Sequence, residues 1–121
     1  MKLDLVADMQ APSAARSFVA AHLAGWKTPL EIATADVTLI ASELVTNALR
    51  AGAGKLALTL SMTRHRVDLT VEDDAAGWPT PRSVTDLDTR GRGLHIVEEL
   101  TDHWQVTATT IGKAITATWF L

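Results

Sequence analysis

A glutamate and an asparagine lie four residues apart in the segment SELVTNALRAG, which runs from residue 42 to residue 52. Residues four apart on a helix point to the same side, so Glu43 and Asn47 would present a carboxylate beside a carboxamide. An amide oxygen suits a hard cation such as Mg²⁺, which completes its shell with water and phosphate oxygens. A carboxylate one turn earlier could orient or deprotonate an attacking hydroxyl group. The same pair could also be ordinary polar residues at a helix edge.

Two further segments have residue types that suit a nucleotide. The segment VEDDAAGWP, residues 71–79, ends a strand with an Asp and continues into a Gly turn, so its carboxylate could accept a hydrogen bond from a ring amine. The segment GRGL, residues 91–94, starts a helix, where free backbone N–H groups favour phosphate. Arg90 and Arg92 add positive charge there. Each segment alone is a weak signal, because Asp-Gly turns and glycine-rich helix starts are common.

Hydrophobic periodicity predicts the elements that would position these residues. Apolar residues at three- and four-residue spacing predict three helices, the first over about 13–24 with Ser13 as its cap, the second from residue 31 or 34 to residue 51, and the third over 91–100. Alternating patterns predict strands over 2–7, 55–62, 66–71, 103–109 and 113–120, with the second and third, and the last two, joined as antiparallel hairpins. We therefore predict an α+β fold, a two-layer α/β sandwich whose mainly antiparallel sheet is covered on one face by helices.

Composition limits the classes of function. A hydrophobic content of 47% and a charged content of 21% are typical of a soluble domain, and we expect one domain over residues 1–121. The net charge of −3, with scattered Lys and Arg, argues against direct binding to nucleic acid. Cysteine is absent, and no apolar run approaches the roughly 20 residues that cross a membrane. The N-terminus does not read as a signal peptide, so we expect a cytoplasmic protein.

Taken together and in this order, the three segments resemble the nucleotide-binding fold shared by gyrase, histidine kinases and MutL, the GHKL or Bergerat fold. The N box would be Glu43 to Asn47, the G1 box Asp73 to Gly77 and the G2 box Gly91 to Gly93. The segments ELVTNAL and GRGLHIVEEL are especially similar to the small anti-sigma-factor serine/threonine kinases and their actinobacterial relatives. The resemblance covers nearly the whole chain.

The resemblance implies ATP and Mg²⁺ as cofactors and a role for each matching residue. Asn47 would bind Mg²⁺, and Glu43 would be the catalytic base. Asp73 would accept a hydrogen bond from the adenine amino group, and Gly77 would shape the floor of the adenine pocket. The residues that would meet the phosphates lie at the start of the last helix: Arg90, Gly91, Arg92, Gly93 and Leu94.

The resemblance also implies partners. The protein would hold a sigma factor inactive and would phosphorylate an anti-anti-sigma antagonist of the STAS type. Relatives of this type are often dimers, which makes a homodimer a further possibility.

One departure from the pattern keeps a second reading open. Ala75 stands where the family's G1 box has a Gly, and a positive φ or a close ligand approach there would cost about 1 kcal/mol or more. The second reading is a non-catalytic module that binds a partner with weak or no nucleotide binding. A histidine-kinase catalytic domain cut from a longer chain ranks third, because the helical hairpin with a phosphoacceptor His is absent from this sequence.

Overall fold

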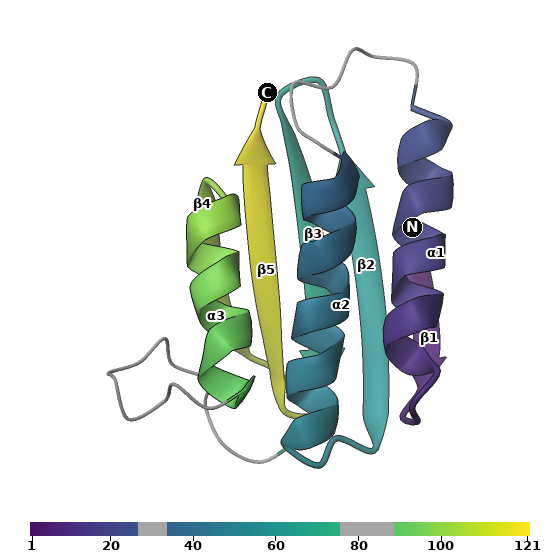
Figure 1. Cartoon of the computed structure of the whole chain (residues 1–121), viewed down its shortest axis with the longest axis vertical. Coiled ribbons are helices and arrows are strands. Elements are labelled where there is room, and N and C mark those ends of the chain that lie inside the picture. Colours follow the sequence, from purple (N-terminus) through teal and green to yellow (C-terminus); the bar gives the residue numbers. More distant parts are fainter. Residues whose placement is uncertain (27–33, 76–88) are drawn as a thin grey trace.

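The computed structural model describes residues 1–26, 34–75 and 89–121, and of residues 89–94 it describes the backbone alone. Figure 1 shows the elements that these ranges form. In chain order they are β1 (Lys2–Val6), α1 (Ala11–Ala24), α2 (Thr34–Arg50), β2 (Lys55–Met62), β3 (Arg66–Asp73), α3 (Thr89–Leu100), β4 (His103–Ala108) and β5 (Lys113–Phe120). The predicted kinds and order of elements are confirmed over these residues.

The strands form one sheet in the order β1-β2-β3-β5-β4, and every described pair of neighbours is antiparallel. Strands β1 and β4 are therefore the edges of this sheet. Figure 1 shows α1, α2 and α3 side by side on one face of it. The predicted two-layer α+β sandwich is confirmed.

The helix-facing side of the sheet is a continuous apolar layer. Every second residue of the central strands is buried there, because successive side chains of a strand point to opposite faces. The register sets three pairs side by side between β3 and β5: Val67 and Trp119, Leu69 and Ala117, Val71 and Ile115. Helix α2 packs on this layer with its own buried stripe, which includes Ile40 and Leu44.

The opposite face of the sheet is polar. The hydroxyl groups of Thr70 and Thr116 form a hydrogen bond of 2.9 Å across β3 and β5. Thr118 donates a hydrogen bond of 2.6 Å to Asp68, which also forms a 2.9 Å ion pair with Arg66. One buried, apolar face and one polar, solvated face are usual for an antiparallel sheet that has helices on a single side.

The start of α1 differs from the prediction. Ser13 was predicted as the N-cap, but the helix begins at Ala11, and Gln10 at the capping position makes no side-chain capping hydrogen bond. Pro12 lies in the first turn, where its missing N–H group has no helical partner to lose. Asp8 accepts a 2.8 Å hydrogen bond from the backbone N–H of Gln10 instead. The prediction of Ser13 as the cap is wrong because the proline, not the serine, suits the start of this helix.

Candidate functional site

The segments singled out in the sequence are carried by elements that meet at one end of the sandwich. Figure 1 shows the C-terminal end of α2, the end of β3 and the start of α3 at the same end of the sheet, and α2 contacts α3. Asn47 lies in the last turn of α2, and Asp73 is the last residue of β3. Gly77 and the side chains at residues 90–94 lie outside the described residues.

The end of α2 is tied directly to the end of β3. Gly52 follows the helix with a φ of 91°, a backbone conformation that glycine adopts without a steric penalty. Two residues later, the backbone N–H groups of Gly54 and Lys55 donate hydrogen bonds of 2.8 and 3.0 Å to Oδ1 of Asp74. These two hydrogen bonds, that from Lys55 first, hold the pKa of the Asp74 carboxyl below its usual range. The contact fixes where α2 ends relative to β3.

The side chains of Glu43 and Asn47 are half-buried beside the core stripe of α2. Nδ2 of Asn47 is buried and has no hydrogen-bond partner within the described part of the chain. A buried donor without an acceptor costs about 1–3 kcal/mol, so a water molecule or a ligand oxygen that accepted its hydrogen would stabilise the site. The amide also carries an oxygen that can coordinate a cation. Asn47 can therefore offer its amide oxygen to a cation and its amide N–H group to a ligand oxygen.

Asp73 forms a buried ion pair with Lys113. The two residues face each other across β3 and β5, and they are 2% and 5% exposed. Nζ of Lys113 donates a 2.8 Å hydrogen bond to Oδ1 of Asp73, and the backbone N–H of Ala75 donates a second one of 2.8 Å to the same oxygen. Nζ also donates to the carbonyl oxygen of Ala75 at 3.2 Å. The carboxylate is thus held in one orientation at the end of the apolar row.

Ala75 shows that the missing glycine carries no backbone penalty here. Among the described residues, no residue other than glycine has a positive φ, so Ala75 adopts a conformation open to any residue. Its side chain is buried, and its backbone N–H and C=O groups both take part in the contacts of Asp73 and Lys113. The cost expected from a positive φ therefore does not arise at Ala75.

Gly112 closes the same corner from the side of β5. A Cβ atom added to Gly112 would lie 2.2 Å from the carbonyl oxygen of Asp73 and 2.9 Å from Cα of Asp74. Real Cβ atoms do not approach other atoms so closely, so only glycine lets the turn before β5 pack on the end of β3. This contact places Lys113, the next residue, beside Asp73.

Sequence reasoning missed Lys113 and Gly112. The signal that could have identified the lysine is its position in the strand KAITATWF. At two-residue spacing Lys113 lies on the same face as Ile115, Ala117 and Trp119, which face the core. A cation in phase with core residues requires a buried acid as its partner. Its partner lies 40 residues earlier in the chain, and only the strand register identifies it.

Three absences bear on other kinds of site. No group of three or more His, Asp or Glu side chains that could hold a metal ion occurs among the described residues. A magnesium ion that relies on one Asn and on phosphate oxygens needs no such group. No helix in the described ranges is long and apolar enough to cross a membrane. The described part of the chain also contains no cysteine.

Comparison with known proteins agrees with the observed fold. The sequence profile of a family described as the histidine kinase-like ATPase domain matches residues 5–119. The RsbU and RsbW domains of Rv1364c from Mycobacterium tuberculosis are similar in structure, with a TM-score of 0.69 and 18% identity over 98% of this chain and 32% of that one. The blue-light activated histidine kinase EL346 from Erythrobacter litoralis matches with a TM-score of 0.53 and 20% identity, over 88% of this chain and 39% of that one.

These structural likenesses define the fold. At 18% and 20% identity they do not assign an activity to this chain, which spans only 32% and 39% of the length of the two solved chains. No curated protein matches the chain.

Proposed function

Because the chain belongs to the family of histidine kinase-like ATPase domains, we propose that it binds ATP with Mg²⁺ where α2, β3 and α3 meet. The observation that carries the proposal is that Asp73 supplies a fixed, buried carboxylate, while Asn47 supplies a buried amide N–H that has no hydrogen-bond partner among the described residues. Asp73 supplies a hydrogen-bond acceptor at the end of β3, and Asn47 supplies an amide group on α2 that can bind a ligand. A purine nucleotide with a hydrated metal ion would use both.

Each residue then has a defined task. Asp73 accepts a hydrogen bond from the adenine amino group, and Asn47 holds Mg²⁺ through its amide oxygen. The backbone at the start of α3 receives the phosphates, because the N-terminal N–H groups of a helix attract anions. Glu43, one turn before Asn47, receives the proton of an acceptor hydroxyl group. The bound nucleotide supplies the phosphoryl group that is transferred.

The proposed acceptor is a Ser or Thr on a second protein, an anti-anti-sigma antagonist of the STAS type, and the proposed regulatory target is a sigma factor. The support for this finer proposal is the similarity of residues 43–49 and 91–100 to the small anti-sigma-factor kinases. Phosphorylation would inactivate the antagonist and leave the protein free to hold the sigma factor, so the protein would regulate transcription without contacting nucleic acid.

Calorimetric titration with Mg-ADP tests nucleotide binding. We expect micromolar affinity, loss of binding in Asn47→Ala, and no change in Glu72→Gln, a control that removes a carboxylate next to Asp73 on the opposite face of the sheet. Thermal melting gives an independent readout, since ligand at 100 times its Kd adds about 2.7 kcal/mol to the stability of the native state. An absence of both heat and Tm shift at millimolar nucleotide would reject the proposal.

Transfer of label from [γ-³²P]ATP to a cognate antagonist tests the kinase step. We expect transfer by the parent protein and its loss in Glu43→Ala, with nucleotide affinity retained. Equal transfer by the parent and by Glu43→Ala would exclude Glu43 as the base.

One observation favours the alternative function, a partner-binding module without turnover. Oδ1 of Asp73 already accepts hydrogen bonds from Lys113 and from the Ala75 backbone, so part of its accepting capacity is used within the protein. If this occupation excludes adenine, the protein would bind the sigma factor with the same affinity in the presence and absence of Mg-ATP. Measuring that affinity in both conditions separates the two functions.

A further inference from the structure

We propose that Lys113 is a second residue that reads the nucleotide base. Its remaining ammonium N–H group donates a hydrogen bond to ring nitrogen N1 of adenine, while Asp73 accepts one from the neighbouring amino group. The inference rests on the proposed nucleotide binding, and it adds a base-reading donor that none of the three sequence segments contains. It follows from the hydrogen-bonding groups that the buried ion pair leaves open.

The ammonium group of Lys113 has one N–H group left to donate. Nζ of a lysine carries three N–H groups. Two of them are accounted for by Oδ1 of Asp73 at 2.8 Å and by the carbonyl oxygen of Ala75 at 3.2 Å. No other described residue accepts the third, although the side chain is nearly inaccessible to solvent. A buried donor without an acceptor costs free energy, so a ligand atom that accepted this hydrogen would bind favourably.

The carboxylate of Asp73 is open at one oxygen. Oδ1 accepts two hydrogen bonds, from Nζ of Lys113 and from the backbone N–H of Ala75, which uses the two lone pairs of that oxygen. No described residue donates to Oδ2. Because the two oxygens share one carbon atom and Nζ lies 2.8 Å from Oδ1, the open acceptor and the remaining donor are close neighbours. The ion pair therefore offers a ligand one acceptor beside one donor.

This combination matches one edge of adenine. Adenine carries an amino group, which donates, next to ring nitrogen N1, which accepts. Oδ2 of Asp73 would accept from the amino group while Nζ of Lys113 donates to N1. Guanine reverses both positions, with a carbonyl oxygen in place of the amino group and an N–H group at N1, so acceptor would face acceptor and donor would face donor. Hydrogen bonds to charged groups are stronger than neutral ones, so the preference should be large.

A purely structural role accounts less well for the ion pair. Asp73 and Lys113 occupy positions that alternate with core residues in β3 and β5. Two apolar side chains of similar size would stabilise the fold as well or better at these positions, because burying a charge requires its removal from water. A pair that also binds a base uses the two charges for recognition.

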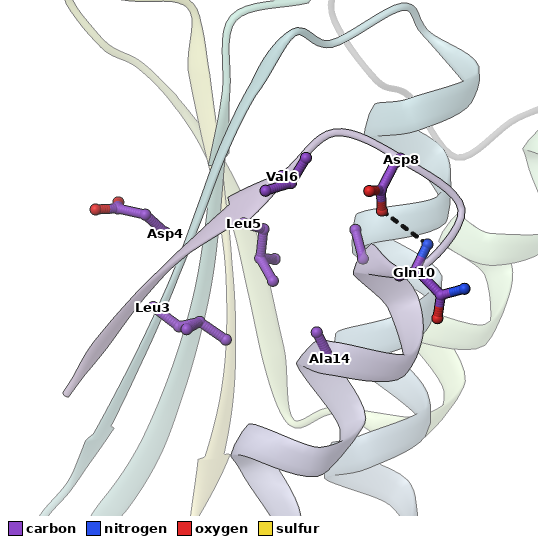
Figure 2. Close-up of a pocket in the computed structure, with 8 residues that line it drawn as sticks. Leu3, Asp4, Leu5, Val6, Asp8, Gln10 and Ala14 are labelled. Carbon is purple, nitrogen blue, oxygen red and sulfur yellow. Dashed lines mark hydrogen bonds between the residues drawn. The ribbon is translucent and has the colours of Figure 1, made fainter.

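A groove between β1 and the start of α1 lacks this combination. It has a volume of about 250 Å³, and Figure 2 shows Leu3 and Leu5 pointing toward α1 while Asp4 points to the other side of the sheet. No Lys, Arg or His lines it, and the Asp8 carboxylate accepts a 2.8 Å hydrogen bond from the backbone N–H of Gln10. A base in this groove would meet no charged donor beside a carboxylate, so the groove is a poorer site for adenine than the ion pair.

Calorimetric titration of the whole chain with three nucleotides, each with Mg²⁺, tests the contact to N1 without any substitution. In 1-deaza-ADP a C–H group replaces N1 and the amino group is kept. We expect it to bind at least about tenfold more weakly than ADP, because the ammonium N–H group loses its acceptor. GDP should bind at least about a hundredfold more weakly than ADP. Equal dissociation constants for ADP and 1-deaza-ADP would overturn the inference, whether or not any variant folds.

The variant Lys113→Met assigns the contact to this lysine. It removes every N–H group of the side chain, and it is titrated at a temperature at which thermal melting shows it to be folded. The ratio of the dissociation constants of 1-deaza-ADP and ADP should fall to about one, since neither nucleotide then has a donor at N1. Lys55→Met, at an exposed lysine of β2, is the matched control and should keep the ratio of the parent. A lysine with a structural role alone would weaken both nucleotides by the same factor, so an unchanged ratio in Lys113→Met would overturn the inference.

The titrations also separate this inference from the proposed function. If the parent binds none of the three nucleotides at millimolar concentration, the proposed function is rejected and the inference with it. If the parent binds ADP without preferring it to 1-deaza-ADP, nucleotide binding stands and the role of Lys113 alone is rejected.

Discussion

Replacing Lys113 with methionine should destabilise the protein strongly. Nζ of Lys113 is the ion-pair partner of Asp73 at 2.8 Å, and both side chains are nearly inaccessible to solvent. Removing one partner of a buried ion pair leaves the other charge without compensation, which typically costs about 3–5 kcal/mol. For a domain of this size such a loss corresponds to a fall in Tm of about 10–20 °C. It is a large fraction of the roughly 5–15 kcal/mol by which a native domain is stable.

The assay is guanidinium unfolding of four proteins: the parent, Lys113→Met, Asp73→Leu and the double variant. Because the double variant replaces both charges with apolar groups, it should be clearly more stable than the sum of the two single losses predicts. Lys55→Met, an exposed lysine at the first position of β2, is the control and should change the stability by less than about 0.5 kcal/mol. A loss below about 1 kcal/mol in Lys113→Met, or strict additivity in the double variant, would refute the role of the ion pair.

Three further predictions concern single substitutions near the site, at Gly112, Asp74 and Asn47. Gly112→Ala should lower the Tm and cost about 1–3 kcal/mol of stability, because the added Cβ would overlap Asp73. Gly25→Ala is the control: the φ of −82° at Gly25 suits any residue, so the Tm of this variant should equal or exceed that of the parent. Asp74→Asn should make the free energy of unfolding less sensitive to acid. Folding lowers the pKa of the Asp74 carboxyl, so this group stabilises the native state at pH values above its unfolded-state pKa, and the contribution is lost as the pH falls through the folded-state pKa. A variant with the same stability–pH profile as the parent would contradict this. Asn47→Ala should leave the Tm of the free protein nearly unchanged, because the buried Nδ2 has no hydrogen-bond partner to lose in the part of the chain that the structure describes. The Tm increase with Mg-ATP should disappear in this variant.

Much of the fold could be predicted because its signals are local. The alternation in β2 and β3 and the three- and four-residue spacing in α2 each depend on neighbours within one element, and the structure confirms all three elements. The start of α1 was not predicted correctly. Ser13 is a favourable capping residue by its type, but the helix begins two residues earlier, at Ala11, with Pro12 in its first turn.

The candidate site was predicted only in part. The sequence singled out Asn47 and Asp73 from their residue types and spacing, and the structure places their elements at one end of the sandwich. It gave no reason to connect Asp73 with Lys113, which lies 40 residues later. The roles of Glu43, Asn47 and Asp73 in binding and catalysis stay predictions until the titrations and label transfer are measured.

By itself, the sequence determined which segments form helices and strands and which of them carry polar groups suited to a nucleotide, because both depend on residues close together in the chain. The tertiary structure alone decided that β5 lies between β3 and β4, and therefore that a lysine faces Asp73 and that β1 is left as an open edge. Strand order and register are settled by the burial of side chains from the whole sheet and its helices at once, and no single segment contains that information.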